Sequence, residues 1–138
     1  MRYLLDTNVL SEARRKRPSP AVMAWMTARL DEELCTSVIC IGEIIICIEA
    51  LERRDPARSA ELRLWLAKVE AIRTIIPVDR RVIGAWAVLR REHKRTVDFE
   101  DMLIAATAAA HNLTVATRNV VDFAPFGVPV IDPWQPRQ

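Results

Sequence analysis

Short apolar runs alternate along this chain with longer segments in which apolar residues recur at helical spacing. The short runs are predicted strands, and they cover residues 3–5, 35–37, 74–78, 114–116 and 128–131. A continuous apolar run between polar turns is typical of a strand buried on both faces of a parallel sheet. Short strands separated by helices therefore predict an α/β fold with a mainly parallel central sheet and right-handed crossovers.

The predicted helices begin at recognisable capping residues. Ser19 and Asp55 each precede a proline at the first helical position, which predicts helices over 20–33 and 56–72. A third helix is indicated by an isoleucine stripe at positions 41, 44, 45 and 48. Further helices are expected over 7–15 and 82–94, and from a cap at Asp98 to an end at Asn112.

Composition places few limits on function. The 138 residues are 51% hydrophobic, with 20 basic and 18 acidic side chains and a formal net charge of +2. This length is typical of one domain with its own core, and the near balance of charge argues against a histone-like binder. We find no signal-peptide core and no apolar stretch that could span a membrane. The expected location is the cytoplasm.

The cysteines support the same location. Cys35, Cys40 and Cys47 are an odd set with apolar neighbours, so we expect buried free thiols in a reducing compartment and not a disulfide framework. They lack the C-x-x-C spacing of a zinc site, and the two histidines are His93 and His111. We therefore do not expect zinc.

Acidic residues far apart in the sequence each lie beside a predicted element boundary. They are Asp6, Glu43, Asp101 and Asp122, with Asn119 close to the last of them. In a parallel sheet such boundaries share one edge, so these side chains can converge there. Converging carboxylates repel one another unless a cation lies between them, and oxygen ligands favour Mg²⁺ or Mn²⁺. The pattern predicts a metal-dependent enzyme that acts on phosphates.

Each of these residues also has a purely structural interpretation. Asp6 and Asp101 can cap helices, although Asp98 fits the second cap better. Glu43 falls off the isoleucine stripe, so it either is solvated or faces a cleft beside Asp6. Asn119 and Asp122 are common turn residues.

Basic and aromatic residues are harder to interpret. Basic runs at 14–17, 80–81 and 90–95 are usually solvated faces, but Arg14 and Arg15 are candidates for RNA binding if they border the acids. We assign Trp65 and Trp86 to packing. Trp25 and its methionine neighbours are expected in the core; the alternative is an exposed patch on residues 22–26 that would favour a homodimer.

Four segments in this order, LLDTNVLSE, TSVICIGEI, DMLIAATAAAHNLTVATRN and VVDF, resemble the PIN-domain ribonucleases. More narrowly, they are similar to VapC-type toxins of bacterial toxin–antitoxin pairs, in the FitB-like subgroup, which the C-terminal VIDPW also fits. The resemblance implies a single PIN domain over residues 1–138, with a three-layer α/β/α fold.

The resemblance also implies a site. The family's acidic positions correspond to Asp6, Glu43 and Asp101, and its fourth position, often aspartate, is Asn119 here. Asp122 then becomes a candidate for the fourth carboxylate, and one or two metals remain open. Polar residues that border the family's site, or lie beside it here, are Thr7, Asn8, Ser37, Thr117 and Arg118.

Members of this family are Mg²⁺- or Mn²⁺-dependent endoribonucleases that hydrolyse RNA with a metal-activated water. The expected partners are RNA, a second copy of the chain and a VapB-type antitoxin, with DNA contacted only through the antitoxin. Two rivals stay open. A haloacid-dehalogenase-like phosphatase requires a second aspartate where this chain has Asn8. The other rival is a catalytically dead PIN scaffold or RNA-binding subunit.

Overall fold

A five-stranded parallel sheet forms the centre of the computed structural model, which describes residues 1–93 and 97–135. Within these ranges the strand order is β3-β2-β1-β4-β5, and all four pairings are parallel. The strands are β1 (Tyr3–Leu5), β2 (Leu34–Ser37), β3 (Thr74–Ile76), β4 (Thr114–Ala116) and β5 (Val130–Ile131). The predicted parallel α/β fold is confirmed.

Seven α-helices surround this sheet in the described part of the chain. They are α1 (Thr7–Glu12), α2 (Pro20–Thr27), α3 (Val38–Leu51), α4 (Pro56–Ile72), α5 (Arg80–Glu92), α6 (Phe99–His111) and α7 (Val120–Phe123). The predicted caps are confirmed: Ser19, Asp55 and Asp98 accept backbone hydrogen bonds at 3.4, 3.1 and 2.9 Å. Asn112 ends α6 in the left-handed conformation that asparagine tolerates, with φ of 54°.

Two helices are shorter than predicted. The first ends at Glu12 because the Glu12 carboxylate accepts from the Ser19 backbone N–H at 2.7 Å and so folds the chain back. The second ends at Thr27, not at residue 33. The Arg29 guanidinium caps its C-terminus at the Trp25 carbonyl, and residues Asp31–Glu33 form a separate 3₁₀ turn.

The predicted strand 128–131 is shorter, since β5 covers only Val130–Ile131, and β2 begins one residue early at Leu34. A proline and a cap account for two further shifts. The third strand ends at Ile76 because Pro77 has no N–H to donate to a ladder. Helix α5 starts at Arg80, two residues early, because Asp79 accepts from Val82 N at 3.0 Å. Its predicted end at residue 94 lies outside the described residues. The short helix α7 was not predicted.

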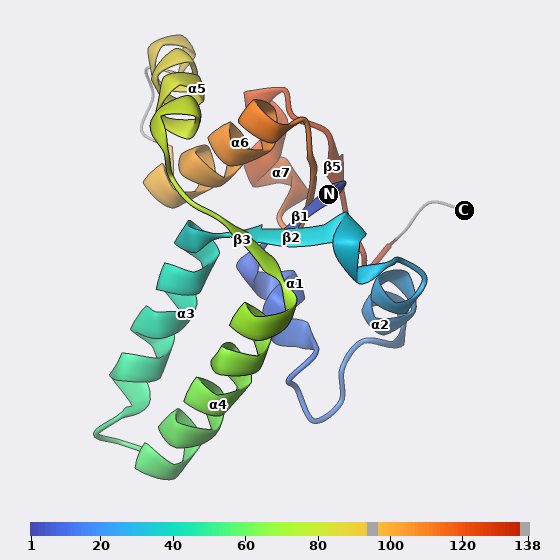
Figure 1. Ribbon diagram of the computed structural model, residues 1–138, viewed down its shortest axis with the longest axis vertical. Coiled ribbons are helices and arrows are strands. Elements are labelled where there is room, and N and C mark those ends of the chain that lie inside the picture. The colour runs from blue at the N-terminus through green and yellow to red at the C-terminus, as the bar shows by residue number, and fades with distance from the viewer. Residues whose placement is uncertain (94–96, 136–138) are drawn as a thin grey trace.

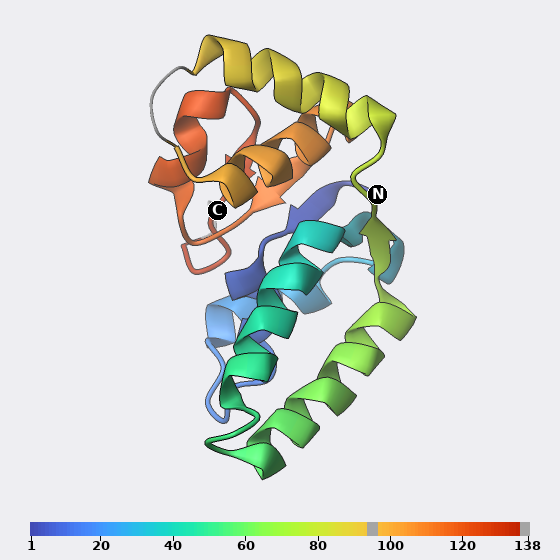
Figure 2. The same cartoon turned by 90° about the vertical axis from the view of Figure 1, so that its left-hand side faces the viewer.

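The order of the strands divides the helices between two faces. The chain moves outward from β1 to β3, then returns past β1 to β4, so right-handed crossovers place α1–α4 on one face and α5–α7 on the other. Figures 1 and 2 show α5, α6 and α7 grouped above the sheet, while α3 and α4 run side by side below it. The result is the expected three-layer α/β/α arrangement.

The core confirms some expectations about single residues and corrects others. Trp25 is buried, at 4% exposure, so α2 does not offer the exposed patch that was the alternative interpretation. Trp65 and Trp86 pack partly buried against the core, as predicted. Cys35 and Cys40 are buried free thiols, but Cys47 is exposed, because it lies off the buried stripe of α3. Within the described ranges, no helix is long and apolar enough to cross a membrane.

Candidate active site

Asp6 lies where the direction of the sheet changes. It directly follows β1, whose neighbours β2 and β4 are reached by crossovers on opposite faces, and such switch points form crevices at the carboxyl ends of strands. The residue is only 6% exposed. Its Oδ1 accepts from Thr7 N at 2.8 Å, and its Oδ2 accepts from Thr117 Oγ1 at 2.7 Å. Asp6 therefore caps α1 and also faces the crevice.

Thr117, which follows β4, connects the two strand ends. Its hydroxyl donates to Asp6 and accepts from Asn119 N at 3.0 Å and from Asn8 Nδ2 at 3.4 Å. Asn8 in turn accepts from the Arg118 backbone N–H at 3.3 Å. Because both lone pairs and the proton of Thr117 are engaged, the orientation of the Asp6 carboxylate is fixed by the fold.

Glu43 faces the same crevice from α3. Thr7 Oγ1 donates to Glu43 Oε1 at 2.9 Å, and one ligand atom from each of Asp6, Cys40 and Glu43 lies within 4.8 Å of the others. The cleft-facing interpretation of Glu43 is the one the geometry supports. Burial raises the pKa of Glu43, and so does repulsion from Asp6.

Cys40 was not predicted as part of this cluster. Burial raises the pKa of its thiol to about 12, with repulsion from Asp6 adding to the effect. Its Sγ lies 4.0 Å from Asp6 Oδ1, to which the thiol is a weak donor. Its position one helical turn before Glu43 is the sequence signal that could have identified it.

Asp101 and Asp122 approach from the other face of the sheet. Asp101 lies half-buried in the first turn of α6, outside the triad that shares the 4.8 Å limit. Its pKa rises to about 7, chiefly through burial, with added repulsion from Asp98, Asp6, Asp122 and Glu43. The pKa of Asp6 is also raised, mainly by burial and in part by Asp122. These acids thus share one electrostatic environment.

Of the other predicted site residues, Asn119 and Asp122 are exposed and Ser37 is buried. Asn119 is exposed and contributes a backbone N–H to Thr117, while its side chain makes no capping hydrogen bond. Ser37 is buried and caps α3 by accepting from Ile39 N at 3.0 Å, so its hydroxyl is committed to the helix and not to the acids. Asp122 is exposed on α7.

The acidic oxygens suit a hard divalent cation. Asp6, Glu43 and Asp101 offer carboxylates from three parts of the fold, and all three have raised pKa values, first because they are desolvated by burial and then because their charges repel. Mg²⁺ and Mn²⁺ prefer such oxygen donors.

Residues 3–124 match the PIN domain. The chain belongs to the PIN-domain family. It is 33% identical over 137 residues to the VapC ribonuclease Y4jK of Sinorhizobium fredii, covering 96% of this chain and 98% of that protein. It is also 33% identical over 135 residues to the toxin FitB of Neisseria gonorrhoeae, covering 95% and 97% respectively.

Solved structures give the same family and fold. The crystal structure of FitAcB from Neisseria gonorrhoeae aligns with a TM-score of 0.85 and 32% identity over 96% of this chain and 98% of that one. The structure of FitAB bound to the IR36 DNA fragment aligns with a TM-score of 0.81 and 30% identity, covering 99% and 98%. The resemblance inferred from the four motifs is thereby confirmed, and so is the PIN fold.

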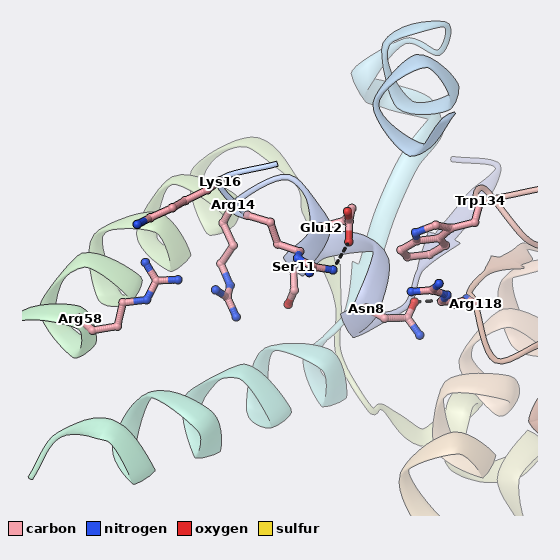
Figure 3. Close-up of a pocket in the computed structure, with 9 residues that line it drawn as sticks. Asn8, Ser11, Glu12, Arg14, Lys16, Arg58, Arg118 and Trp134 are labelled. Carbon is pink, nitrogen blue, oxygen red and sulfur yellow. Dashed lines mark hydrogen bonds and ion pairs between the residues drawn. The ribbon is translucent and has the colours of Figure 1, made fainter. Parts of the chain in front are cut away.

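A basic cavity adjoins the acidic crevice of this PIN domain. It has a volume of about 600 Å³ and contains both predicted RNA-binding candidates, Arg14 and Arg15. Figure 3 shows Arg14 reaching in with Lys16 and Arg58 at one end, and Arg118 at the other. Arg15 is held by Glu12 at 3.4 Å.

Proposed function

We propose that this chain is a metal-dependent endoribonuclease and the toxin of a type II toxin–antitoxin pair. The observation that carries the proposal is the approach of Asp6 and Glu43, both hydrogen-bonded to Thr7, at the switch point of the sheet, with Asp101 in the first turn of α6. The names of the relatives support it, because two similar proteins are called a VapC ribonuclease and the toxin FitB.

Three carboxylates would hold the cation in this proposal. Asp6 is oriented by Thr117 and Thr7, and Glu43 is oriented by the hydroxyl of the same Thr7. Asp101 completes the set from α6. A bound Mg²⁺ or Mn²⁺ supplies charge neutralisation at the phosphate and lowers the pKa of the attacking water.

The protein's own contribution is a carboxyl group that becomes charged when the cation binds. With a pKa of about 7, Asp101 gives up its proton readily near neutral pH when a cation binds. Asp122, exposed at the rim, is the proposed fourth carboxylate, and Asn119 is the alternative. Hydrolysis by water in this crevice leaves a 5′-phosphate and a 3′-hydroxyl.

The proposed partners are also based on the similarity to VapC and FitB toxins. A VapB-type antitoxin would bind the helical face beside the crevice, where α1, α3 and α4 enclose a small apolar hollow that includes Ile44, Ile48, Leu62 and Trp65. We further propose that the chain acts as one PIN domain over residues 1–138, works in the cytoplasm as a homodimer, and meets DNA only through the antitoxin.

Cleavage by the purified chain tests the enzyme. A single-stranded RNA is incubated with wild type in Mn²⁺ or in EDTA, and with Glu43→Gln and Glu49→Gln. Both glutamates lie on α3, but Glu49 is exposed and outside the acidic cluster. We expect cleavage only with metal, its loss in Glu43→Gln and its retention in Glu49→Gln.

Other outcomes favour the rivals. RNA binding without cleavage in any metal would indicate the dead scaffold. A phosphoryl group trapped on Asp6, with hydrolysis of a phosphomonoester, would indicate the phosphatase. Asn8, which stands where that chemistry needs an acid, is instead hydrogen-bonded to Thr117 and Arg118.

A further inference from the structure

The basic cavity beside the acids has an unusual concentration of positive charge. Its lining residues are Asn8, Ser11, Glu12, Arg14, Arg15, Lys16, Arg58, Arg118 and Trp134. Five of them are cationic and one is a carboxylate, a formal excess of four positive charges. That carboxylate is already engaged by the Ser19 backbone and by Arg15. The cavity therefore keeps a net positive charge after its one internal ion pair.

The individual cations show the same imbalance. Among the described residues, no carboxylate lies within ion-pairing distance of Arg14, Lys16 or Arg118, and Arg58 pairs only with the exposed Glu61 at 3.4 Å. The pKa of Arg14 is lowered, first by burial and then by repulsion from Arg58. Cations held together in this way attract a polyanion.

The cavity is joined directly to the acidic crevice. Arg118 follows Thr117, whose hydroxyl holds Asp6, and the Arg118 backbone N–H donates to Asn8, which lines the cavity. The Arg118 guanidinium lies 4.9 Å from the centre of the Trp134 ring, and Figure 3 shows the two side by side at this end. A cation stacked on an aromatic face is restrained in position.

We propose that this cavity holds the phosphates of single-stranded RNA on one side of the scissile bond. Arg118 contacts the phosphate nearest the acids, and Arg14 and Arg58 contact phosphates further along the strand. Trp134 is a positioning residue that keeps the Arg118 guanidinium in place. This inference rests on the proposed ribonuclease function. RNA is favoured over an acidic peptide because the cations lie at both ends of the cavity and continue from the crevice where the scissile phosphate is expected.

Binding measured without cleavage tests the cavity. Fluorescence anisotropy in EDTA is recorded with an RNA of about twelve nucleotides, within the range one groove covers. Arg118→Gln and Arg58→Gln should each weaken binding about tenfold. Each should also reduce the slope of log K against log salt by about 0.7, the value for one phosphate contact of a single strand. Lys68→Gln is the matched control, because it removes one exposed charge from α4 outside the cavity.

Trp134 is tested by its effect on Arg118. Trp134→Leu should weaken RNA binding as much as Arg118→Gln, and adding Trp134→Leu to Arg118→Gln should change little further. Trp134→Phe should restore most of the affinity because it keeps an aromatic face under the guanidinium. Additive losses, or equal weakening by Phe and Leu, would contradict the positioning role.

The outcomes separate this proposal from the proposed function. Suppose that wild type cleaves RNA, and that the variant carrying both Arg58→Gln and Arg118→Gln matches Lys68→Gln in RNA affinity and in salt dependence. The cavity assignment is then wrong, and the proposed ribonuclease function is kept. If wild type does not cleave RNA but the double variant loses RNA binding, the proposed ribonuclease function is wrong and the assignment of the cavity to RNA is kept. Loss of affinity for a polyglutamate peptide with none for RNA would assign the cavity to an acidic protein segment and overturn the proposal.

Discussion

The acidic crevice and the basic cavity share a border at Asn8 and Thr117, yet they are built in opposite ways. The crevice uses short carboxylates that are buried or half-buried and oriented by threonine hydroxyls. The cavity uses long side chains, largely exposed, from a loop, a helix and a strand end. In the crevice burial and mutual repulsion raise the pKa values of Asp6, Glu43 and Asp101, whereas the cavity gathers side chains of the opposite charge.

The difference reflects what each region is expected to bind. A small divalent ion needs oxygens at fixed short distances, so the fold fixes the position of Asp6 through Thr117. A nucleic-acid backbone is long and uniformly charged, so a broad field of cations is sufficient to hold it. Damage to the crevice should therefore stop chemistry, and damage to the cavity should weaken binding.

The largest expected effect is on catalysis by the crevice. Asp101→Asn keeps the size of the side chain but removes a charge that the cation needs, so kcat should fall by about a thousandfold or more, the scale of a lost transition-state contact. KM should change little. The measurement is steady-state RNA cleavage in Mn²⁺, with Arg58→Gln as the opposite case, in which KM rises and kcat is kept. Equal effects of both variants on kcat would remove the distinction between the two regions.

Metal should stabilise the fold because it relieves repulsion in the crevice. A ligand at a hundred times its Kd adds about 2.7 kcal/mol when it binds only the native state. Thermal unfolding in Mn²⁺ should therefore occur several degrees higher than in EDTA, and Glu43→Gln should reduce that shift. An unchanged Tm in excess Mn²⁺ would count strongly against a metal site.

The hydrogen bond between Thr117 and Asp6 should contribute to stability as well as to geometry. Thr117→Val leaves the buried shape but removes the partner of Asp6 Oδ2, which costs about 1–3 kcal/mol. Chemical denaturation measures it. Thr107→Val is the control, since Thr107 is equally buried but donates only to a backbone carbonyl within its own helix. A larger loss for Thr107→Val would contradict this prediction.

The smallest expected effect is the pH dependence of the metal-free fold. The pKa of Asp101 is raised to about 7, so the folded state favours its protonated form. Its contribution to stability is present below about pH 4 and is lost as pH rises towards 7. In EDTA at pH 8, Asp101→Asn should be more stable than wild type by on the order of 1 kcal/mol after solvent screening, and the two should converge near pH 4. The reverse order at pH 8 would be inconsistent with repulsion in the crevice.

Much of the crevice was predictable because its residues are tied to the backbone. Asp6 and Thr117 follow short apolar strands, and strand ends in a parallel sheet meet at one edge whatever the helices do. Helix caps were predictable for a similar reason, because capping is a local interaction, and those at Ser19, Asp55 and Asp98 are confirmed.

The cavity and several boundaries were less predictable because they depend on tertiary contacts. The run 14–17 was recognised as a candidate, but nothing in the sequence joins Arg58 or Trp134 to it. The early end of α1 depends on the hydrogen bond between Glu12 and Ser19. Cys40 lies beside Asp6 because α3 packs against the end of β1. Side chains that meet across elements carry no fixed sequence spacing.

The central position of β1 has a consequence for the timing of synthesis. Its partner β2 follows about 30 residues later, but Thr117, which comes directly after β4, lies 111 residues after Asp6. At a synthesis rate of roughly 5–20 residues per second, Thr117 is made some 5–20 seconds after Asp6. A nascent or truncated chain thus has no assembled crevice, and a version ending at residue 113 should not cleave RNA even with Mn²⁺. We therefore expect no RNA cleavage by the chain before Thr117 has been made and has reached Asp6.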